Sequence, residues 1–231
     1  MYRVLLIDAD HTLIDYKKDE LAAFSRMLPD FRLPADEESV EYASSVSEET
    51  WTEVGLYDVQ SERIQREYHA LYRSHVEILF ERLFSHFGVT GDSRLAGARF
   101  LKELEAPAHL IEGSKETLER LKGRYQIAVA TNGVCSIQEG RLLSLAGHFS
   151  HLFVSERLGA IKPTAAFFER ALQELGAKKE ECLMIGDSVT SDVDGAASFG
   201  LDACWFNPMG KKMRTAAKYE IRNLSELLEI L

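Results

Sequence analysis

The chain carries two kinds of hydrophobic pattern. Short continuous apolar runs, separated by segments of helical period, occur at the start of the chain and throughout its second half. Runs of this kind are typical of strands buried on both faces of a parallel sheet. They predict strands at residues 2–7, 125–130, 151–154, 182–185 and 201–206. The segments between and after them predict helices at residues 136–146, 164–175, 190–199 and 224–230.

The stretch from residue 15 to residue 91 shows the helical period alone. Phe24 and Met27 recur at helical spacing there, and so do Tyr68 and Leu71. Strands that alternate with helices imply an α/β fold whose parallel sheet is covered on both faces. We therefore expect a core of residues 1–14 and 92–231. Residues 15–91 are expected to form a helical cap, inserted after the first strand and packed over the carboxyl ends of the strands.

The composition narrows the range of partners. The formal net charge of −10 argues against a general surface for nucleic-acid polymers, and a small anionic substrate would need a local positive site. No apolar run approaches the roughly 20 residues of a membrane helix, so no membrane partner is expected. The first residues enter a strand pattern directly and lack a signal-peptide pattern. The three cysteines have no paired spacing, which favours reduced thiols and a cytoplasmic location.

Polar residues stand near the ends of the predicted strands. In open α/β sheets the carboxyl ends of the strands meet at one edge, where ligands bind. The polar residues expected at this edge are Asp8, Asp10 and Thr12 after the first strand, Thr131 and Asn132 after the second, Lys162 before the helix at 164–175, and Asp187 and Asp192 after the fourth strand. Pro163 suits a first helical turn, so Lys162 is expected at the mouth of that helix. Asp8 at the end of a buried strand needs a cation or hydrogen bonds beside it.

These residue types are suited to magnesium-assisted phosphoryl transfer. Mg²⁺ prefers oxygen ligands in octahedral geometry, which carboxylates, water and a substrate phosphate supply. One carboxylate can attack phosphorus when a lysine neutralises the phosphate, and a second carboxylic acid can protonate the leaving group. Each piece alone has an ordinary structural explanation, namely a turn at residues 8–10 or 131–133 and a helix cap at residues 186–188. Their order and shared position make the combination specific.

The chain resembles the haloacid dehalogenase superfamily of hydrolases over its whole length. Four stretches correspond to the motifs of that superfamily, in the same order along the chain. They are Asp8-Ala9-Asp10-His11-Thr12, then Thr131, then Lys162, and last Gly186-Asp187 through Asp192. The resemblance implies an α/β fold of the Rossmann-like three-layer sandwich type with a parallel central sheet and an inserted α-helical cap.

The resemblance also implies a role for each motif residue. Asp8 would be the nucleophile that forms an aspartyl-phosphate, and Asp10 would be the general acid and base. The groups expected to bind the phosphoryl group are Thr131, Asn132 and Lys162. The expected Mg²⁺ ligands are Asp8, the backbone carbonyl of Asp10, and Asp187, with Asp192 and Thr12 in support.

An acid at position 10 goes with the phosphatases of the superfamily. The dehalogenases resemble this sequence less, because they lack a carboxylate there and need no magnesium. Many members have Gly or Asn at the position of His11, which we interpret as a tolerated loop residue. The nearest group is the pyrimidine 5′-nucleotidases, which the chain resembles at residues 8–13, 131–133, 154–156 and 204–207. The expected activity is therefore Mg²⁺-dependent hydrolysis of a small phosphorylated substrate, a nucleoside 5′-monophosphate.

Three other functions stay open at this point. They are a phosphatase for a sugar phosphate or phosphoglycolate, a phosphomutase, and a non-catalytic protein that binds a phosphorylated ligand. Substrate specificity is expected in the cap, where an aromatic side chain could stack on a base. The candidate contacts are Tyr16, Trp51, Tyr57 and Arg66. The aromatic residues among them could also pack the core of the cap, and the sequence does not indicate an oligomeric state.

Overall fold

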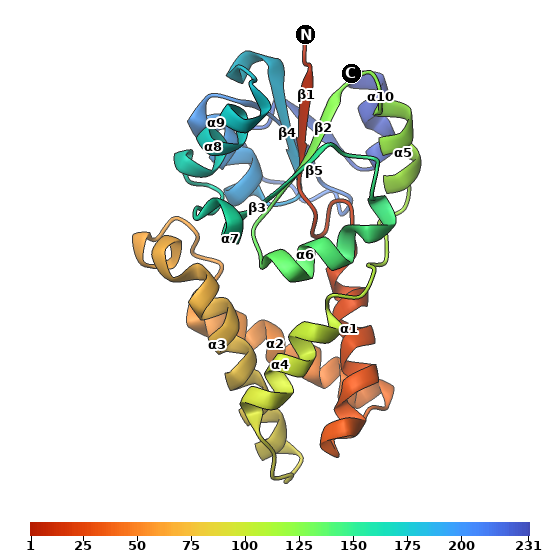
Figure 1. Ribbon diagram of the computed structural model, residues 1–231, viewed down its shortest axis with the longest axis vertical. Coiled ribbons are helices and arrows are strands. Elements are labelled where there is room, and N and C mark those ends of the chain that lie inside the picture. The colour runs from red at the N-terminus through yellow and green to blue at the C-terminus, as the bar shows by residue number, and fades with distance from the viewer.

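The computed structural model describes residues 1–231, which form an α/β core and a helical bundle beside it (Figure 1). Both chain ends lie on the side of the core that is farthest from the bundle. The strands run from that side toward the bundle, so their carboxyl ends face it. The bundle is inserted after the first strand, and two connections of the chain therefore join it to the core.

One sheet of parallel strands forms the centre of the core. The strand order is β3-β2-β1-β4-β5-β6, and every pairing is parallel. The strands are β1 (Val4–Ile7), β2 (Gln126–Thr131), β3 (His151–Val154), β4 (Cys182–Gly186), β5 (Asp202–Phe206) and β6 (Tyr219–Ile221). The predicted α/β fold and parallel sheet are confirmed, and each predicted strand is present. β6 was not predicted, because it has only 3 residues and no apolar run.

Helices cover both faces of the sheet, as the alternation of strands and helices predicts. The covering helices are α5 (Ser114–Leu121) and α10 (Leu227–Ile230) on one face, and α8 (Ala165–Leu175) and α9 (Gly195–Phe199) on the other (Figure 1). Successive side chains of a strand point to opposite faces. In β1, Leu5 and Ile7 therefore enter the apolar core on the α5 side, whereas Val4 and Leu6 enter the core on the α8 side.

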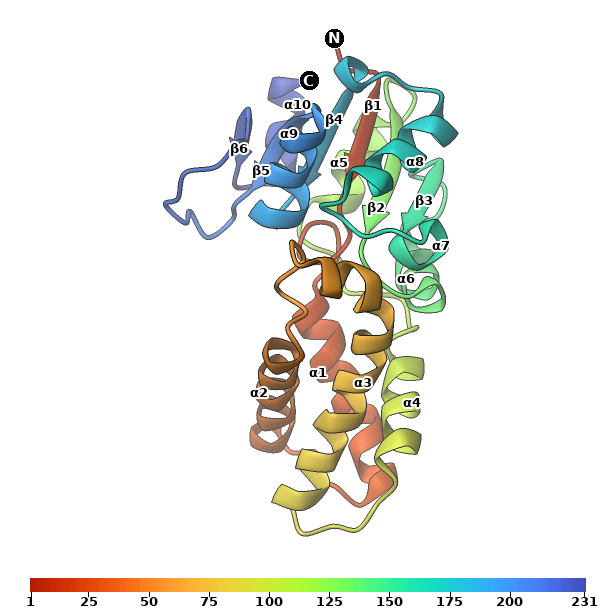
Figure 2. The same ribbon diagram turned by 90° about the vertical axis from the view of Figure 1, so that its left-hand side faces the viewer.

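Four helices make up the bundle. They are α1 (Tyr16–Met27), α2 (Glu37–Val54), α3 (Glu62–His86) and α4 (Ser93–Glu103) (Figure 2). These helices share one apolar core, in which the rings of Phe24 from α1 and Phe100 from α4 stack with their centroids 4.5 Å apart. The predicted boundary at residue 91 falls before α4, whereas the packing of α4 favours a boundary after Leu104. No helix combines the length and the apolar character needed to cross a membrane.

Several predicted helices differ from the structure at their ends. α8 begins at Ala165, and Pro163 lies in the loop before it, joined to Lys162 by a cis peptide bond. The expectation that Lys162 stands at the mouth of this helix is therefore wrong, because a loop holds it. The predicted helix at 190–199 is a π-helical turn (Val189–Asp194) followed by α9. The helices next to the strand ends are α6 (Cys135–Arg141) and the single turn α7 (Ser155–Leu158).

His75 makes the stability of the bundle depend on pH. Its ring is buried in the bundle core, where Nδ1 lies 2.6 Å from the carbonyl oxygen of Tyr72 and Nε2 has no hydrogen-bond partner. Burial lowers the pKa of His75 to about 4, from an ordinary value of 6.5. Between these two values the unfolded chain binds a proton that the folded chain does not. The contribution of His75 to stability is therefore complete above pH 6.5 and is lost as the pH falls.

We expect the substitution His75→Phe to remove this part of the pH dependence. The difference in unfolding free energy between wild type and variant should change by about 2 to 3 kcal/mol between pH 7 and pH 4.5. Urea titrations at several pH values measure it. His86→Phe, at the exposed end of the same helix, controls for the loss of an imidazole. Parallel curves for wild type and His75→Phe would contradict the prediction.

Candidate active site

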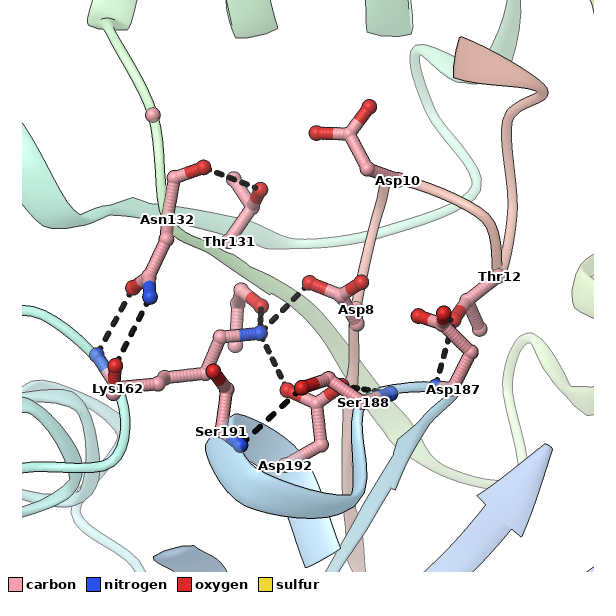
Figure 3. A network of polar contacts seen from close by, with 12 residues as sticks. Asp8, Asp10, Thr12, Thr131, Asn132, Lys162, Asp187, Ser188, Ser191 and Asp192 are labelled. Atoms are coloured by element: carbon pink, nitrogen blue, oxygen red, sulfur yellow. Dashed lines mark hydrogen bonds and ion pairs between the residues drawn. The ribbon is translucent and has the colours of Figure 1, made fainter. Parts of the chain in front are cut away.

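The carboxyl ends of three neighbouring strands place acidic and hydroxyl side chains close together (Figure 3). β1 lies between β2 and β4 in the sheet. Asp8 directly follows β1, Thr131 is the last residue of β2, and Asp187 directly follows β4. Because the three strands are parallel and adjacent, these side chains meet at one edge. The structure thus brings together residues that lie far apart in the sequence.

The ammonium group of Lys162 lies at the centre of this cluster. The side chain is buried, and Nζ donates hydrogen bonds to Asp8 Oδ1 at 2.6 Å and to Asp192 Oδ1 at 2.7 Å. Its third hydrogen bond goes to the carbonyl oxygen of Ala130 at 2.6 Å. Three acceptors satisfy the three donors of an ammonium group. Lys162 therefore links the carboxylate after β1 to the carboxylate in the π-helical turn.

Asn132 holds the loop that carries Lys162. Its side-chain Nδ2 donates to the carbonyl oxygen of Lys162 at 2.9 Å, and its Oδ1 accepts from the N–H of Lys162 at 2.8 Å. These two bonds use one of the two N–H groups of Nδ2 and one lone pair of Oδ1. Asn132 also lines the cavity at this edge, and its contact with phosphate, through the side chain or the backbone N–H, stays a prediction.

The cluster is buried and holds more carboxylates than cations, and both conditions raise the pKa values of Asp8 and Asp187. Burial raises the pKa of Asp8 to about 7, against the charge of Lys162 and assisted by those of Asp192 and Asp10. Burial, with the charge of Asp8, raises the pKa of Asp187 to about 6. Oxygen atoms of Asp8, Asp187 and Asp192 lie within 4.8 Å of one another. Crowded oxygen donors that resist ionisation fit a divalent cation such as Mg²⁺, whose charge favours the ionised carboxylates.

The two acidic residues after β4 have different surroundings. Asp192 Oδ1 accepts from Lys162, and Asp192 Oδ2 accepts from the N–H of Ser188 at 3.2 Å. A methyl group on Gly186 would lie 2.1 Å from Asp192 Oδ2, so this close approach requires glycine. The Asp187 carboxylate has one hydrogen bond, at 3.4 Å, from Thr12. Most of its lone pairs can therefore bind a ligand, whereas both oxygens of Asp192 are engaged.

Thr12 and His11 shape the loop between β1 and α1. Thr12 Oγ1 accepts from the N–H of Asp187 at 3.1 Å, which holds this loop against the end of β4. His11 has a φ of 58°, in the left-handed region where Gly and Asn are favoured. Its exposed ring contacts Tyr16 edge-on, with centroids 5.9 Å apart. The backbone at His11 thus adopts a conformation that Gly and Asn adopt more readily than most residues.

Asp10 is oriented differently from Asp8. Figure 3 shows its carboxylate turned away from Asp8 and Lys162. It forms an ion pair with the guanidinium of Arg141 and accepts a hydrogen bond from Gln138 Nε2 at 2.7 Å. Burial acts to raise the pKa of Asp10, but the charge and hydrogen bond of Arg141 outweigh it and hold the pKa below its ordinary value. The pKa of Asp8, the predicted nucleophile, is therefore raised, whereas the pKa of Asp10, the predicted general acid and base, is lowered.

The sequence interpretation missed Gln138 and Arg141. Both residues lie on α6 and belong to none of the motifs recognised along the chain. Residues three positions apart on a helix share a face. The signal that could have found them is a polar pair on one face of a helix that begins soon after the strand end at Thr131.

A cavity of about 1060 Å³ lies between the strand ends and the bundle. The predicted site residues that line it on the core side include Asp8, Asp10, Thr131, Asn132, Lys162, Asp187 and Asp192. On the bundle side, Tyr16, Trp51 and Tyr57 line it, whereas Arg66 is exposed on α3 and does not. Trp51 also packs edge-on against Tyr72, with ring centroids 5.5 Å apart. Trp51 is therefore part of both the cavity lining and the packing of the bundle.

Comparisons with known proteins agree with this geometry. The haloacid dehalogenase-like hydrolase family matches the chain over residues 2–200. Pyrimidine 5′-nucleotidase PynA of Streptococcus pneumoniae is 33% identical, over 100% of this chain and 95% of its own. Glyceraldehyde 3-phosphate phosphatase of Pyrococcus furiosus is 29% identical, over 99% of this chain and 92% of its own. The magnesium-bound structure of the HAD-hydrolase YfnB from Bacillus subtilis has a TM-score of 0.85 and 29% identity, and the match covers 99% of this chain and 98% of that one. The chain therefore belongs to the haloacid dehalogenase-like hydrolase family.

Proposed function

We propose that this phosphatase hydrolyses nucleoside 5′-monophosphates, with pyrimidine nucleotides as the substrate class, and that it requires Mg²⁺. The observation that carries the chemistry is the buried Lys162 ammonium between Asp8 and Asp192, beside the accessible carboxylate of Asp187. The similarity to PynA over the whole chain supports a nucleotide substrate. The cavity of about 1060 Å³ has room for a nucleoside, and Tyr16 and Trp51 offer aromatic faces for a base.

In the first step, a carboxylate oxygen of Asp8 attacks phosphorus and the bond from phosphorus to the 5′ oxygen breaks. Asp10 donates a proton to the departing oxygen, so that the nucleoside leaves as an alcohol. Lys162 acts through its charge, because its three donors are already used. Arg141 keeps Asp10 ionised in the free enzyme. Asp10 takes up this proton from solvent when the substrate binds, because the phosphate dianion beside it raises the pKa of its carboxyl group.

In the second step, Asp10 takes a proton from a water molecule that attacks the phosphorus of the aspartyl-phosphate. The bond between phosphorus and the Asp8 oxygen breaks and inorganic phosphate leaves. Asp8 is then a free carboxylate again, and Asp10 again carries the proton that it held before the first step. Asp8, the backbone carbonyl of Asp10, and Asp187 would hold Mg²⁺. Bound Mg²⁺ neutralises phosphate oxygens and favours the ionised form of Asp8.

A second candidate function is hydrolysis of a small sugar phosphate. The 29% identity to the glyceraldehyde 3-phosphate phosphatase of Pyrococcus furiosus over nearly the whole chain supports it. A phosphomutase would return an isomer of its substrate in place of inorganic phosphate. A non-catalytic protein would bind phosphate esters without turnover, and the intact set of Asp8, Asp10, Lys162 and Asp187 argues against this.

We expect the substitution Asp8→Asn to lower phosphate release by at least about a thousandfold, because an amide does not form the covalent intermediate. The measurement is inorganic phosphate released from pyrimidine and purine nucleoside monophosphates, sugar phosphates and phosphoglycolate, each with Mg²⁺. Asp30→Asn, at an exposed position in the turn after α1 that does not line the cavity, is the matched control and should keep wild-type rates.

Two results would overturn the proposal at different levels. Full activity of a correctly folded Asp8→Asn variant would exclude the aspartyl-phosphate mechanism. Rapid turnover of sugar phosphates by the wild-type enzyme, with nucleotides inert, would keep the mechanism and exclude the nucleotidase assignment.

We expect the substitution Asp187→Asn to weaken Mg²⁺ binding by at least tenfold, because it removes a charged oxygen ligand with few other contacts. Isothermal titration calorimetry of Mg²⁺ into the protein without substrate measures this directly. The melting temperature should rise with Mg²⁺ for the wild type, and much less for the variant. Asp30→Asn again serves as control. Equal affinities for wild type and Asp187→Asn would exclude Asp187 as a ligand.

A further inference from the structure

We propose that Gln138 and Arg141 are positioning residues that hold the Asp10 carboxylate for proton transfer, with Asp19 of the bundle as the anchor of Arg141. This inference rests on the proposed function, because it says which residues orient the general acid of that mechanism. It concerns two residues of α6 and one of α1 that belong to none of the sequence motifs. Three sets of contacts carry it.

The first set of contacts comes from Gln138. Its side chain is buried, and the single nitrogen Nε2 donates to Asp10 Oδ2 at 2.7 Å and to Thr131 Oγ1 at 2.9 Å. One amide group therefore sets the spacing between the expected acid and an expected phosphate-binding hydroxyl. Gln138 Oε1 in turn accepts from Arg141 Nη1 at 3.3 Å, which orients the amide so that its nitrogen faces Asp10.

The second set of contacts comes from Arg141, whose side chain is about 1% exposed. Nη1 pairs with Asp10 Oδ1, so that each oxygen of the Asp10 carboxylate has one donor from α6. Two donors on two oxygens fix the plane of a carboxylate as well as its place. The guanidinium also lies over the ring of Tyr16, 5.2 Å from its centroid, which limits its movement toward the cavity.

The third set of contacts fixes Arg141 to the bundle. Its Nη2 and Nε donate to Asp19 Oδ2 on α1, at 2.8 Å and 3.2 Å. Asp19 Oδ1 accepts from the N–H of His109 at 2.8 Å, and His109 lies on the second connection between bundle and core. Asp19, in the first turn of α1, therefore lies beside both connections between the bundle and the core. A movement of α1 against α6 would act on Arg141 and through it on Asp10.

Two substrates with different leaving groups can distinguish a role of Gln138 and Arg141 in positioning Asp10 from a role in stability alone. A nucleoside 5′ alkoxide is a strong base and needs a proton as it departs, whereas 4-nitrophenolate is a weak base and departs without one. The ratio kcat/KM reports the steps up to the first irreversible transfer to Asp8, and excludes the later hydrolysis that both substrates share. A misplaced Asp10 should therefore slow the nucleotide much more than the aryl ester.

The experiment compares kcat/KM for a pyrimidine nucleoside 5′-monophosphate and for 4-nitrophenyl phosphate, both with Mg²⁺. For Arg141→Met we expect the nucleotide value to fall at least tenfold more than the aryl value, and for Arg141→Lys we expect a smaller selective loss. Asp10→Asn should show the same selectivity and sets its upper limit. Asp19→Asn should change the ratio in the same direction as Arg141→Met.

Gln138→Met keeps the inference testable if Arg141→Met does not fold. It removes the donor to Asp10 and leaves no buried charge without a partner, and we expect the same selective loss. Loss of the Thr131 contact affects both substrates alike and cancels in the ratio. Arg157→Met, an exposed arginine paired with Glu139, is the matched control and should leave both values unchanged.

The outcomes are distinguishable. Equal losses for both substrates in folded Gln138→Met and Arg141 variants would overturn the positioning role and leave the proposed function standing. An unchanged ratio in Asp19→Asn would overturn the anchoring by the bundle. Absence of phosphate release from either ester by the wild-type enzyme would overturn the proposed function, and this inference with it.

Discussion

The site depends on one ammonium group buried among carboxylates. An ion leaves water at a cost of several kcal/mol, which only close partners of opposite charge offset. Lys162 has those partners in Asp8 and Asp192, and removing Lys162 would leave both buried carboxylates without their cation. The surrounding geometry keeps them in contact. Asn132 clamps the backbone of Lys162, and glycine at position 186 lets Asp192 approach the end of β4.

A second buried cation divides the acids into two environments. Lys162 does not outweigh burial at Asp8, whose pKa is raised to about 7, whereas Arg141 outweighs burial at Asp10, whose pKa is lowered. Two carboxyl groups two positions apart along the chain therefore have pKa shifts of opposite direction, set by burial at Asp8 and by Arg141 at Asp10. Both cations reach the strand ends from elsewhere in the chain, so the division exists only in the folded protein.

The bundle contributes to the site as well as covering it. Its aromatic residues Trp51 and Tyr72 pack its own core, while Trp51 and Tyr16 also face the cavity above the strand ends. Asp19 brings α1 into the ion-pair network of Arg141. The chain enters the bundle near Asp15 and leaves it near His109. Asp19 contacts both His109 and Arg141, and Arg141 pairs with Asp10, so one polar network joins the second connection to Asp10. The same helices therefore pack as an apolar unit and reach the chemistry at the strand ends.

The sequence by itself determined the parallel α/β fold, the inserted helices and the edge at which the acidic residues meet. It could do so because each apolar run is long enough to specify a buried strand and the polar residues follow those runs directly. It could not indicate β6, whose edge position needs no apolar run, or the loop that holds Lys162. Only the tertiary structure decided what Asn132, Gln138 and Arg141 contact. Apart from the bond between Gln138 and Arg141 within α6, the partners described above lie on other segments, between 7 and 131 positions away along the chain. Such pairings follow from how the helices pack against the strand ends.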